Sequence, residues 1–148
     1  MKKILFVCHG NICRSPMAEF IMKKLVTDEG PQEDIYIESA AVSNEETGND
    51  MYPPAKRKLT EKGVPFAKRR ARTVTRDDFR SFDLIVAMDS YNLRNLERIV
   101  GRSDKVSKLL DHTSRKGEDI SDPWYSGDFE TAYNDIYEGC RGLLDELK

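Results

Sequence analysis

Cys8 and Arg14 stand six positions apart, and their types and spacing fit covalent chemistry on a phosphate group. A cysteine thiolate is a strong nucleophile, and a planar guanidinium can hold two phosphate oxygens with paired hydrogen bonds. The spacing alone is weak evidence, because chains with several cysteines and arginines produce it by chance. The alternative is a small buried cysteine beside a solvated arginine, so the surrounding residues must decide between the two interpretations.

The segment between these two residues has the composition of a phosphate-binding turn. It follows the apolar stretch 4–8, contains Gly10, and leads into Ser15 and Pro16, which we expect to cap and begin a helix. Backbone N–H groups converge in a strand-to-helix turn and, with the positive end of the helix, favour an anion or a thiolate. The turn lacks both a Walker A ending and GxGxxG spacing. We therefore predict a phosphate site next to Cys8.

Cleavage of a phosphate monoester by a thiolate also needs a proton donor, because an alkoxide or phenoxide leaves poorly without one. Asp122 stands out among the acidic residues, since Pro123 stiffens its loop and Trp124 and Tyr125 could form an aromatic wall. The alternative is an ordinary turn built on the Asp-Pro dipeptide. We interpret Asp122 as the candidate general acid.

These segments lie between elements that alternate as in an α/β domain with a parallel sheet and helices on both faces. The expected strands are 4–8, 35–39, 84–87 and 105–109. The expected helices are 16–28, 54–62, 91–100 and 129–147. No repeat or linker divides the chain, so we predict one three-layer domain over residues 1–148 with about four parallel strands. Its site should lie where strand ends meet helix starts.

Composition and charge exclude several classes of function. A chain of 148 residues that is 39% hydrophobic and 34% charged is neither low-complexity nor strongly disordered. The net charge of -2 gives no general attraction to nucleic acid or acidic membranes, so neither is an expected partner. The longest apolar runs, 4–8 and 84–88, are far too short to span a bilayer, and the polar loop at His9 ends the first before a signal-peptide core could form. We expect a cytoplasmic protein.

The cysteines and histidines favour thiol chemistry over structural disulfides or metal binding. Three cysteines are a poor disulfide framework for a chain that can build a core, so Cys8, Cys13 and Cys140 should be thiols. Cys8 and Cys13 lack metal-ligand spacing, and His9 and His112 stand far apart in the sequence. We expect no metal and no cofactor, and a surface or turn position for His112.

Taken together, the two motifs resemble those of the low-molecular-weight protein tyrosine phosphatases, and the likeness covers essentially all of the chain. The principal matches are CHGNICRSP over residues 8–16 and DPWY over residues 122–125, in the family's order and spacing. Shorter matches are Ser39-Ala40-Ala41, Gly48-Asn49, Phe82-Asp83 and the MDSYNL segment over 88–93. The residues CHGN at the start of the first motif favour a bacterial member of the family.

The resemblance implies a role for each motif residue. Cys8 would be the nucleophile that forms a phosphocysteine, Arg14 would bind the phosphoryl group, and Asp122 would act as acid and then base. Ser15 would ease departure of the thiolate, while Asn11 and Ser39 would hold the loop in shape. The implied phosphate- and substrate-binding residues are His9, Gly10, Asn11, Ile12, Cys13, Trp124 and Tyr125. The implied substrate is a phosphotyrosine-containing protein, the product is inorganic phosphate, and no metal is needed.

Several positions leave alternatives open. Cys13 resembles a second loop cysteine that captures the oxidised nucleophile as a disulfide, or it is a packed small side chain. Lys68 stands where many members have a histidine near Asn11, and Glu45 where several have an aromatic on the cleft rim. The run of Arg69, Arg70 and Arg72 is interpreted as a solvated surface. In the C-terminal helix, Tyr133, Ile136, Leu143 and Leu144 are expected to pack in the core.

Three other functions compete with tyrosine phosphatase activity. A protein-arginine phosphatase would use the same loop, but related enzymes have threonine where this chain has Ile12. An arsenate reductase would need further cysteines in the middle of the chain, and none lies between Cys13 and Cys140. A phosphate-binding or phosphocarrier module that does not hydrolyse its ligand would have no need of Asp122.

Overall fold

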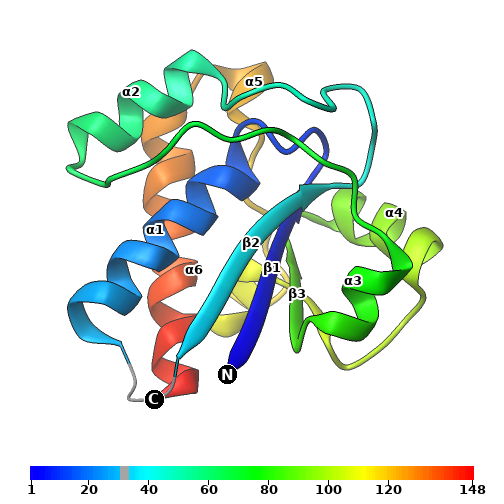
Figure 1. Cartoon of the computed structure of the whole chain (residues 1–148). Coiled ribbons are helices and arrows are strands. Elements are labelled where there is room, and N and C mark those ends of the chain that lie inside the picture. Colours follow the sequence, from blue (N-terminus) through cyan, green and yellow to red (C-terminus); the bar gives the residue numbers. More distant parts are fainter. Residues whose placement is uncertain (31–33) are drawn as a thin grey trace.

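The apolar segment near the N-terminus forms the centre of a four-stranded parallel sheet (Figure 1). The computed structural model describes residues 1–30 and 34–148. Its strands are β1 (Lys2–Cys8), β2 (Ile35–Ala41), β3 (Leu84–Ala87) and β4 (Val106–Lys108), in the spatial order β2-β1-β3-β4. The five residues from Ile4 to Cys8 are all buried, because β1 is covered on both faces. The predicted α/β class with four parallel strands is confirmed.

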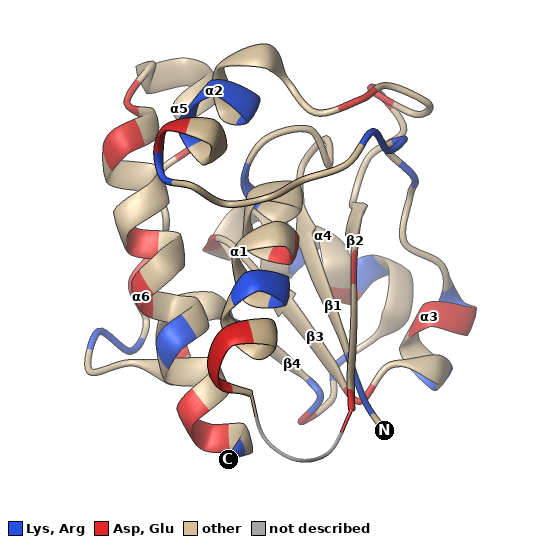
Figure 2. Cartoon of the chain, turned by 60° about the vertical axis from the view of Figure 1, so that its left-hand side comes forward, with Lys and Arg blue, Asp and Glu red and all other residues tan. Residues whose placement is uncertain are grey.

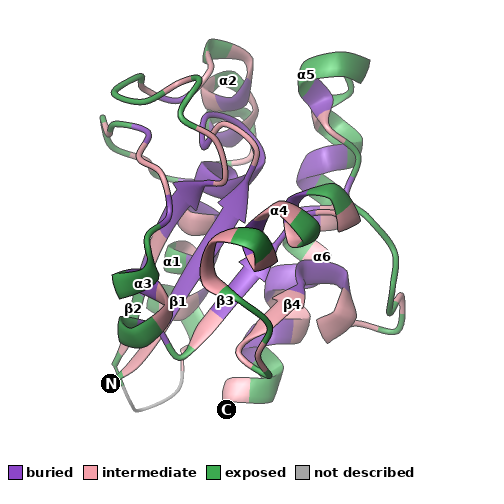
Figure 3. Cartoon of the chain, turned by 90° about the vertical axis from the view of Figure 1, so that its right-hand side faces the viewer, coloured by how far each residue is buried: buried purple, intermediate pink, exposed green. Residues whose placement is uncertain are grey.

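The upper part of β1 is buried between the elements that cover the sheet (Figure 3). Side chains that alternate along β1 enter two separate cores, one on each face of the sheet. Ile4, Phe6 and Cys8 pack in the larger core, whereas Leu5 and Val7 pack in the smaller one. The larger core is covered by α1 (Arg14–Glu29), α2 (Pro53–Glu61) and α6 (Phe129–Leu147). The smaller core is covered by α3 (Arg76–Ser81) and α4 (Ser90–Val100). The predicted packing of Tyr133, Ile136, Leu143 and Leu144 in the larger core is confirmed.

The observed bounds correct several sequence-based expectations. The helix expected from residue 16 begins at Arg14, with Cys13 in the capping position, so Ser15 is not the N-cap. Ser15 is fully buried and its hydroxyl bonds to side chains of the loop instead. The strand expected over 105–109 ends at Lys108, because Leu109 begins a 3-10 helix, η1 (Leu109–His112). The other expected strands and helices agree with the structure to within two residues at each end.

His112 lies at the end of the 3-10 turn η1, in agreement with the expected turn position, and its side chain also has two partners. Its Nε2 lies 2.8 Å from Ser107 Oγ, and its Nδ1 lies 2.7 Å from a carboxylate oxygen of Glu146 near the end of α6. The imidazole therefore joins the end of β4 to the C-terminal helix. The partners are 5 and 34 residues away in sequence, which is why the sequence alone gave no indication of the second contact.

Ion pairs reinforce the helical layer that lies on the larger core (Figure 2). Lys58 and Lys62, at the C-terminal end of α2, both reach Glu130 in the first turn of α6 at 2.9 Å. Arg141 on α6 pairs with Glu29 at the end of α1. No helix in the described part of the chain has the length and apolar character needed to cross a membrane.

Candidate active site

Parallel pairing brings the segments that follow β1 and β3 to the same edge of the sheet. Val7 lies opposite Ala87, so the loop 9–13 and the residues after β3 emerge side by side. Helix α1 begins at Arg14 and directs its N-terminus at this edge. Unpaired N–H groups and the helix dipole therefore face the space above Cys8, which favours negative charge there.

Cys8 ends β1 and is almost fully buried, with its sulfur next to the first turn of α1. The Sγ atom lies 3.0 Å from Ser15 Oγ and accepts a hydrogen bond from the Ser15 backbone N–H at 3.4 Å. Both Ser15 atoms belong to the start of the helix. The sulfur is thus placed where hydrogen bonds and the helix dipole stabilise a thiolate.

Asn11 shapes the loop from beneath. It is completely buried and has a φ of 59°, a left-handed conformation that asparagine tolerates better than most residues. Its side-chain Nδ2 donates to Ser15 Oγ at 2.8 Å and to Ser39 Oγ at 2.9 Å. Asn11 is one of the residues expected to bind phosphate, but its side chain faces the protein interior.

The direction of these hydrogen bonds is fixed by a carboxylate behind the loop. Ser39 donates its hydroxyl proton to Glu19 at 2.6 Å, so its oxygen is free to accept from Asn11. Ser15 in turn accepts from Asn11, and its own proton has two acceptors within reach, Cys8 Sγ at 3.0 Å and the Ala40 carbonyl at 3.5 Å. Glu19, whose role was not foreseen from the sequence, thereby helps to orient the side chains beside Cys8 through Ser39 and Asn11.

Arg69, and not Lys68, contacts Asn11. The Arg69 guanidinium donates to Asn11 Oδ1, and the backbone N–H of Arg72 donates to the same oxygen at 3.3 Å. The side chain of Arg72 pairs with Asp78 and Glu38. The interpretation of the arginine run as a solvated surface is therefore wrong for Arg69 and Arg72, and holds only for the exposed Arg70.

Arg14 is buried at the bottom of the site and is held by three acceptors. Its Nη1 donates to Asp89 and to the carbonyl of Ile120, both at 2.7 Å, and its Nη2 donates to Asp122 at 3.3 Å. Burial alone would lower the pKa of the guanidinium, but nearby negative charges raise it above its ordinary value. These charges are those of Cys8, Asp122 and Asp89.

Asp122 precedes a short helix, α5 (Pro123–Ser126), and caps its N-terminus. One carboxylate oxygen accepts from the backbone N–H of Trp124 at 3.0 Å, while the other faces Arg14. About a quarter of the Asp122 side chain (24%) is exposed, so a substrate can reach it. Trp124 packs against Tyr52 with ring centroids 4.7 Å apart.

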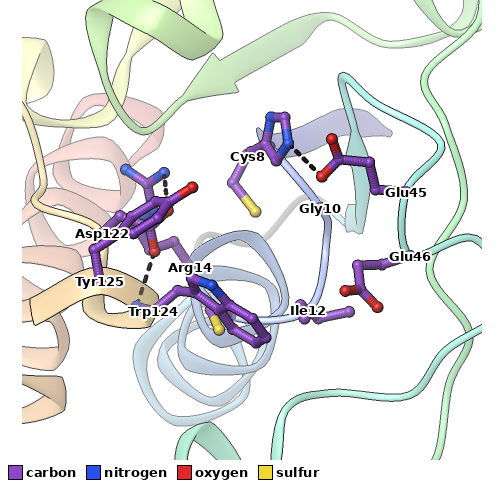
Figure 4. A pocket seen from close by; sticks show the side chains of 11 residues that line it. Cys8, Gly10, Ile12, Arg14, Glu45, Glu46, Asp122, Trp124 and Tyr125 are labelled. Carbon is purple, nitrogen blue, oxygen red and sulfur yellow. Dashed lines mark hydrogen bonds and ion pairs between the residues drawn. The ribbon is translucent and has the colours of Figure 1, made fainter. Parts of the chain in front are cut away.

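These residues line one pocket, with the loop as its floor (Figure 4). The loop and the start of α1 contribute Cys8, His9, Gly10, Ile12, Cys13 and Arg14. One wall is formed by Asp122, Trp124 and Tyr125, and the opposite wall by Glu45 and Glu46. The structure therefore brings together the two sequence motifs, which are about a hundred residues apart, around one sulfur atom.

Comparison with known proteins gives the family of this chain. Residues 3–148 match the family model described as low molecular weight phosphotyrosine protein phosphatase. The chain belongs to this family, and it is a phosphatase of the cysteine-dependent class. Relatives occur in eukaryotes and bacteria. The low molecular weight phosphotyrosine protein phosphatase of Pongo abelii is 40% identical over 151 residues, covering 98% of this chain and 95% of that protein.

Solved structures of the phosphatase family agree in fold. The crystal structure of YfkJ from Bacillus subtilis is 36% identical, with a TM-score of 0.94, and the alignment covers 99% of this chain and 94% of that one. The crystal structure of DARP, a drosophila arginine phosphatase, is also 36% identical, with a TM-score of 0.89 and coverage of 100% and 98%. Proteins with this fold are thus named as tyrosine phosphatases and as an arginine phosphatase.

Cys13 lies in the phosphatase loop but in a different environment from Cys8. It is 5% exposed, and its burial, followed by the negative charges of Cys8 and Asp122, raises the pKa of its thiol well above the ordinary value. The thiol of Cys13 is therefore protonated at neutral pH. This environment fits a packed side chain and also fits a slow-reacting partner for an oxidised Cys8.

The rim of the phosphatase pocket differs on its two sides. Glu45 pairs with His9 Nε2 at 2.9 Å, and Glu46 accepts from Asn49 at 2.6 Å. The rim is therefore acidic at Glu45, the position where several family members have an aromatic residue. On the other side, Trp124 and Tyr125 are substantially exposed. Within residues 1–30 and 34–148, no group of three or more His, Cys, Asp or Glu side chains is placed to hold a metal ion.

Sequence reasoning missed three residues of the phosphatase site, namely Glu19, Arg69 and Asp89. Asp89 follows a buried strand at the carboxyl edge of the sheet, so its position gave a usable indication. Glu19 and Arg69 gave none, because a charged residue on a helix and another in a basic run are usually solvated.

Proposed function

We propose that this protein hydrolyses phosphotyrosine monoesters of proteins through a phosphocysteine intermediate. The observation that carries the proposal is the convergence of Cys8, Arg14 and Asp122 on one pocket at the N-terminus of α1. A nucleophile, a fixed cation for the phosphoryl oxygens and a carboxyl group for the leaving oxygen are the groups that such a reaction requires.

In the first step, the thiolate of Cys8 attacks phosphorus as the bond to the tyrosyl oxygen breaks. The phosphoryl group is held by Arg14 and by the N–H groups of the loop, which act where negative charge accumulates. The carboxyl proton of Asp122 passes to the leaving oxygen, so tyrosine departs as a neutral phenol. The products are phosphocysteine and the Asp122 carboxylate.

In the second step, water replaces the sulfur. The Asp122 carboxylate takes a proton from the water, whose oxygen bonds to phosphorus as the S–P bond breaks. Ser15 Oγ lies 3.0 Å from Cys8 Sγ, and a hydrogen bond from this hydroxyl would stabilise the departing thiolate. Inorganic phosphate leaves, and Asp122 again carries a proton.

The pocket walls favour an aromatic phosphate ester. Trp124 and Tyr125 provide aromatic surface above the floor, with Tyr52 packed against Trp124, and Ile12 adds an apolar contact. The likeness to an arginine phosphatase makes phosphoarginine a second candidate substrate. We favour phosphotyrosine, because the apolar side chain of Ile12 offers no hydroxyl group to a guanidinium.

The decisive test is steady-state hydrolysis of a phosphotyrosine peptide and of phosphoarginine, measured on the unmodified protein and its variants. We expect turnover of phosphotyrosine, no turnover by Cys8→Ser, and a loss of about 10²–10⁴-fold in Asp122→Ala. Asp104→Ala, which removes an exposed carboxylate remote from the pocket lining, is the matched control and should keep full activity. Preference for phosphoarginine would overturn the substrate assignment. Full turnover by Asp122→Ala would overturn its role.

We also propose that the protein acts in the cytoplasm, on phosphoproteins of that compartment. All three cysteines are free thiols in the structure, and a thiolate nucleophile is preserved best in a reducing compartment. The chain's net charge of -2 favours neither a nucleic-acid nor a membrane partner. Fractionation of cells that express the protein, followed by detection of its activity, would test this location.

A further inference from the structure

Lys108, the last residue of β4, is a buried cation outside the pocket. The residue is only 6% exposed, and its ammonium group donates three hydrogen bonds. The acceptors are Ser90 Oγ at 2.9 Å, the carbonyl of Gly117 at 2.7 Å and Asp119 Oδ1 at 2.8 Å. Every donor of the ammonium group is used, which is what a buried charge requires.

Two of these acceptors belong to the segment that leads to Asp122. Asp119 Oδ1 also accepts from the backbone N–H and the hydroxyl of Ser90, at 3.0 and 3.1 Å. Burial would raise the pKa of Asp119, but the hydrogen bonds from Lys108 and Ser90 lower it below its ordinary value. The Asp119 carboxylate is therefore charged, and the contact with Lys108 is an ion pair.

The same cluster lies next to both sides of the catalytic arrangement. Ser90 directly follows Asp89, which holds Arg14. Asp119 directly precedes Ile120, whose N–H bonds to the Met88 carbonyl at 2.9 Å and whose carbonyl accepts from Arg14. The cluster of Lys108, Ser90 and Asp119 thus fixes the start of α4 and the segment before Asp122 to each other.

We propose that Lys108 is a positioning residue for the general acid. Its ammonium group ties the 117–119 segment to β4 and α4 and thereby sets the distance from the Asp122 carboxyl group to the leaving oxygen. This inference rests on the proposed function. Lys108 does not line the pocket, so its effect on the reaction is indirect and passes through the segments that it ties together. A displacement of about 1 Å in a catalytic group can reduce a rate by about 10²-fold.

The test compares two aryl phosphates that differ in their need for an acid. Phenolate is a strongly basic leaving group that requires protonation, whereas 4-nitrophenolate leaves with little assistance. For Lys108→Met, which keeps the apolar stem, kcat/KM should fall by about 10²-fold with phenyl phosphate and by no more than about threefold with 4-nitrophenyl phosphate. Competitive inhibition by inorganic phosphate should stay unchanged, because the floor of the pocket is intact.

Arg115→Met is the matched control, since Arg115 lies just before the 117–119 segment and ties this part of the chain to α6 instead of to β4 and α4. Its guanidinium reaches Asp135 at 2.8 Å and Glu138 at 3.0 Å, both on α6, and Glu118 at 3.2 Å, but it does not contact Lys108, Ser90 or Asp119. This variant should lose some stability without a change in the ratio of the two rates. Asp119→Asn, at a side chain that is 48% exposed, removes the same ion pair from the loop side and carries the test if Lys108→Met does not fold.

The outcomes separate the positioning role of Lys108 from the proposed phosphatase function. A selective loss with phenyl phosphate in Lys108→Met or Asp119→Asn, absent in Arg115→Met, supports the positioning role. An equal loss with both substrates, no loss, or the same selective loss in Arg115→Met overturns it while the wild-type rates still support the phosphatase. A wild type that hydrolyses neither ester overturns the proposed function, and the positioning role with it.

Discussion

The buried guanidinium of Arg14 forms a 2.7 Å ion pair with Asp89, which lies 75 residues further along the chain. The same Nη1 donates to the Ile120 carbonyl, so the guanidinium plane is fixed by acceptors from two separate segments. Arg14 therefore has a defined orientation, set by the protein's own side chains and backbone. A cation that is already oriented stabilises transition-state charge without reorganisation during the reaction.

Replacement of Asp89 by Asn should weaken this arrangement. Asn keeps the size of the side chain but has a single acceptor oxygen, so it cannot both cap α4 and accept from Arg14, as the two carboxylate oxygens of Asp89 do. We expect kcat/KM for a phosphotyrosine peptide to fall by about tenfold, measured in the steady state. Asp104→Asn, at an exposed position, provides the control. Equal rates in the two variants would show that Asp89 does not orient Arg14.

Arg69 and Arg70 are adjacent arginines with different environments, and they form a matched pair. Arg69 donates to Asn11 beneath the loop, whereas Arg70 is exposed. Loss of a hydrogen bond from a charged donor should lower the free energy of unfolding of Arg69→Met by about 2 kcal/mol. The same variant should lose activity, because Asn11 holds the left-handed turn of the loop. Urea denaturation and steady-state rates measure both effects.

Arg70→Met should match the unmodified protein in both measurements. If Arg69→Met also matches it, the contact with Asn11 does not support the loop. Lys68→Met offers a further comparison, since Lys68 stands where the family resemblance implies a histidine near Asn11. Its exposed side chain should be replaceable without effect on either quantity.

The sequence predicted local elements well and distant contacts poorly. The strand β1, the helix α6 and the two chemical motifs could be inferred, because apolar periodicity and motif spacing are properties of short segments. Helix α3 was missed: its six residues are mostly polar, although the capping box formed by Thr75 and Asp78 was a readable indication.

Side-chain partners across the fold could not be predicted in the same way. The contacts of Arg14 with Asp89 and of Arg69 with Asn11 span 75 and 58 residues, so they depend on how the sheet and loops come together. The expectation that Ser15 caps α1 failed for a related reason. Its hydroxyl is taken by Cys8 and Asn11, and these contacts outweigh the local preference for a capping role.

The environment of Cys13 predicts how it should respond to oxidation. Peroxide converts the Cys8 thiolate to a sulfenic acid, and attack by Cys13 would form a disulfide and release water. Because burial raises the pKa of Cys13, the crosslink should form slowly at neutral pH and faster as the pH rises. Mass spectrometry of peptides from treated protein would detect it. Cys140, which is fully buried, should remain unmodified, and the absence of a crosslink would leave Cys13 a packing residue.

The ion pair of Arg72 with Asp78 predicts a pH dependence of stability. Burial would raise the pKa of Asp78, but hydrogen bonds from Arg72 and Thr75 lower it below its ordinary value of about 3.9. A carboxyl group with a lowered folded-state pKa stabilises the protein above the unfolded-state pKa, and this contribution is lost as the pH falls through the folded-state pKa. Asp78→Asn should therefore reduce the free energy of unfolding by about 2 kcal/mol at pH 6, and the difference should shrink below about pH 4. Asp77→Asn, at the exposed neighbouring residue, is the control and should show no such trend in urea titrations. If the loss of stability in Asp78→Asn stays constant with pH, the ion-pair explanation is contradicted.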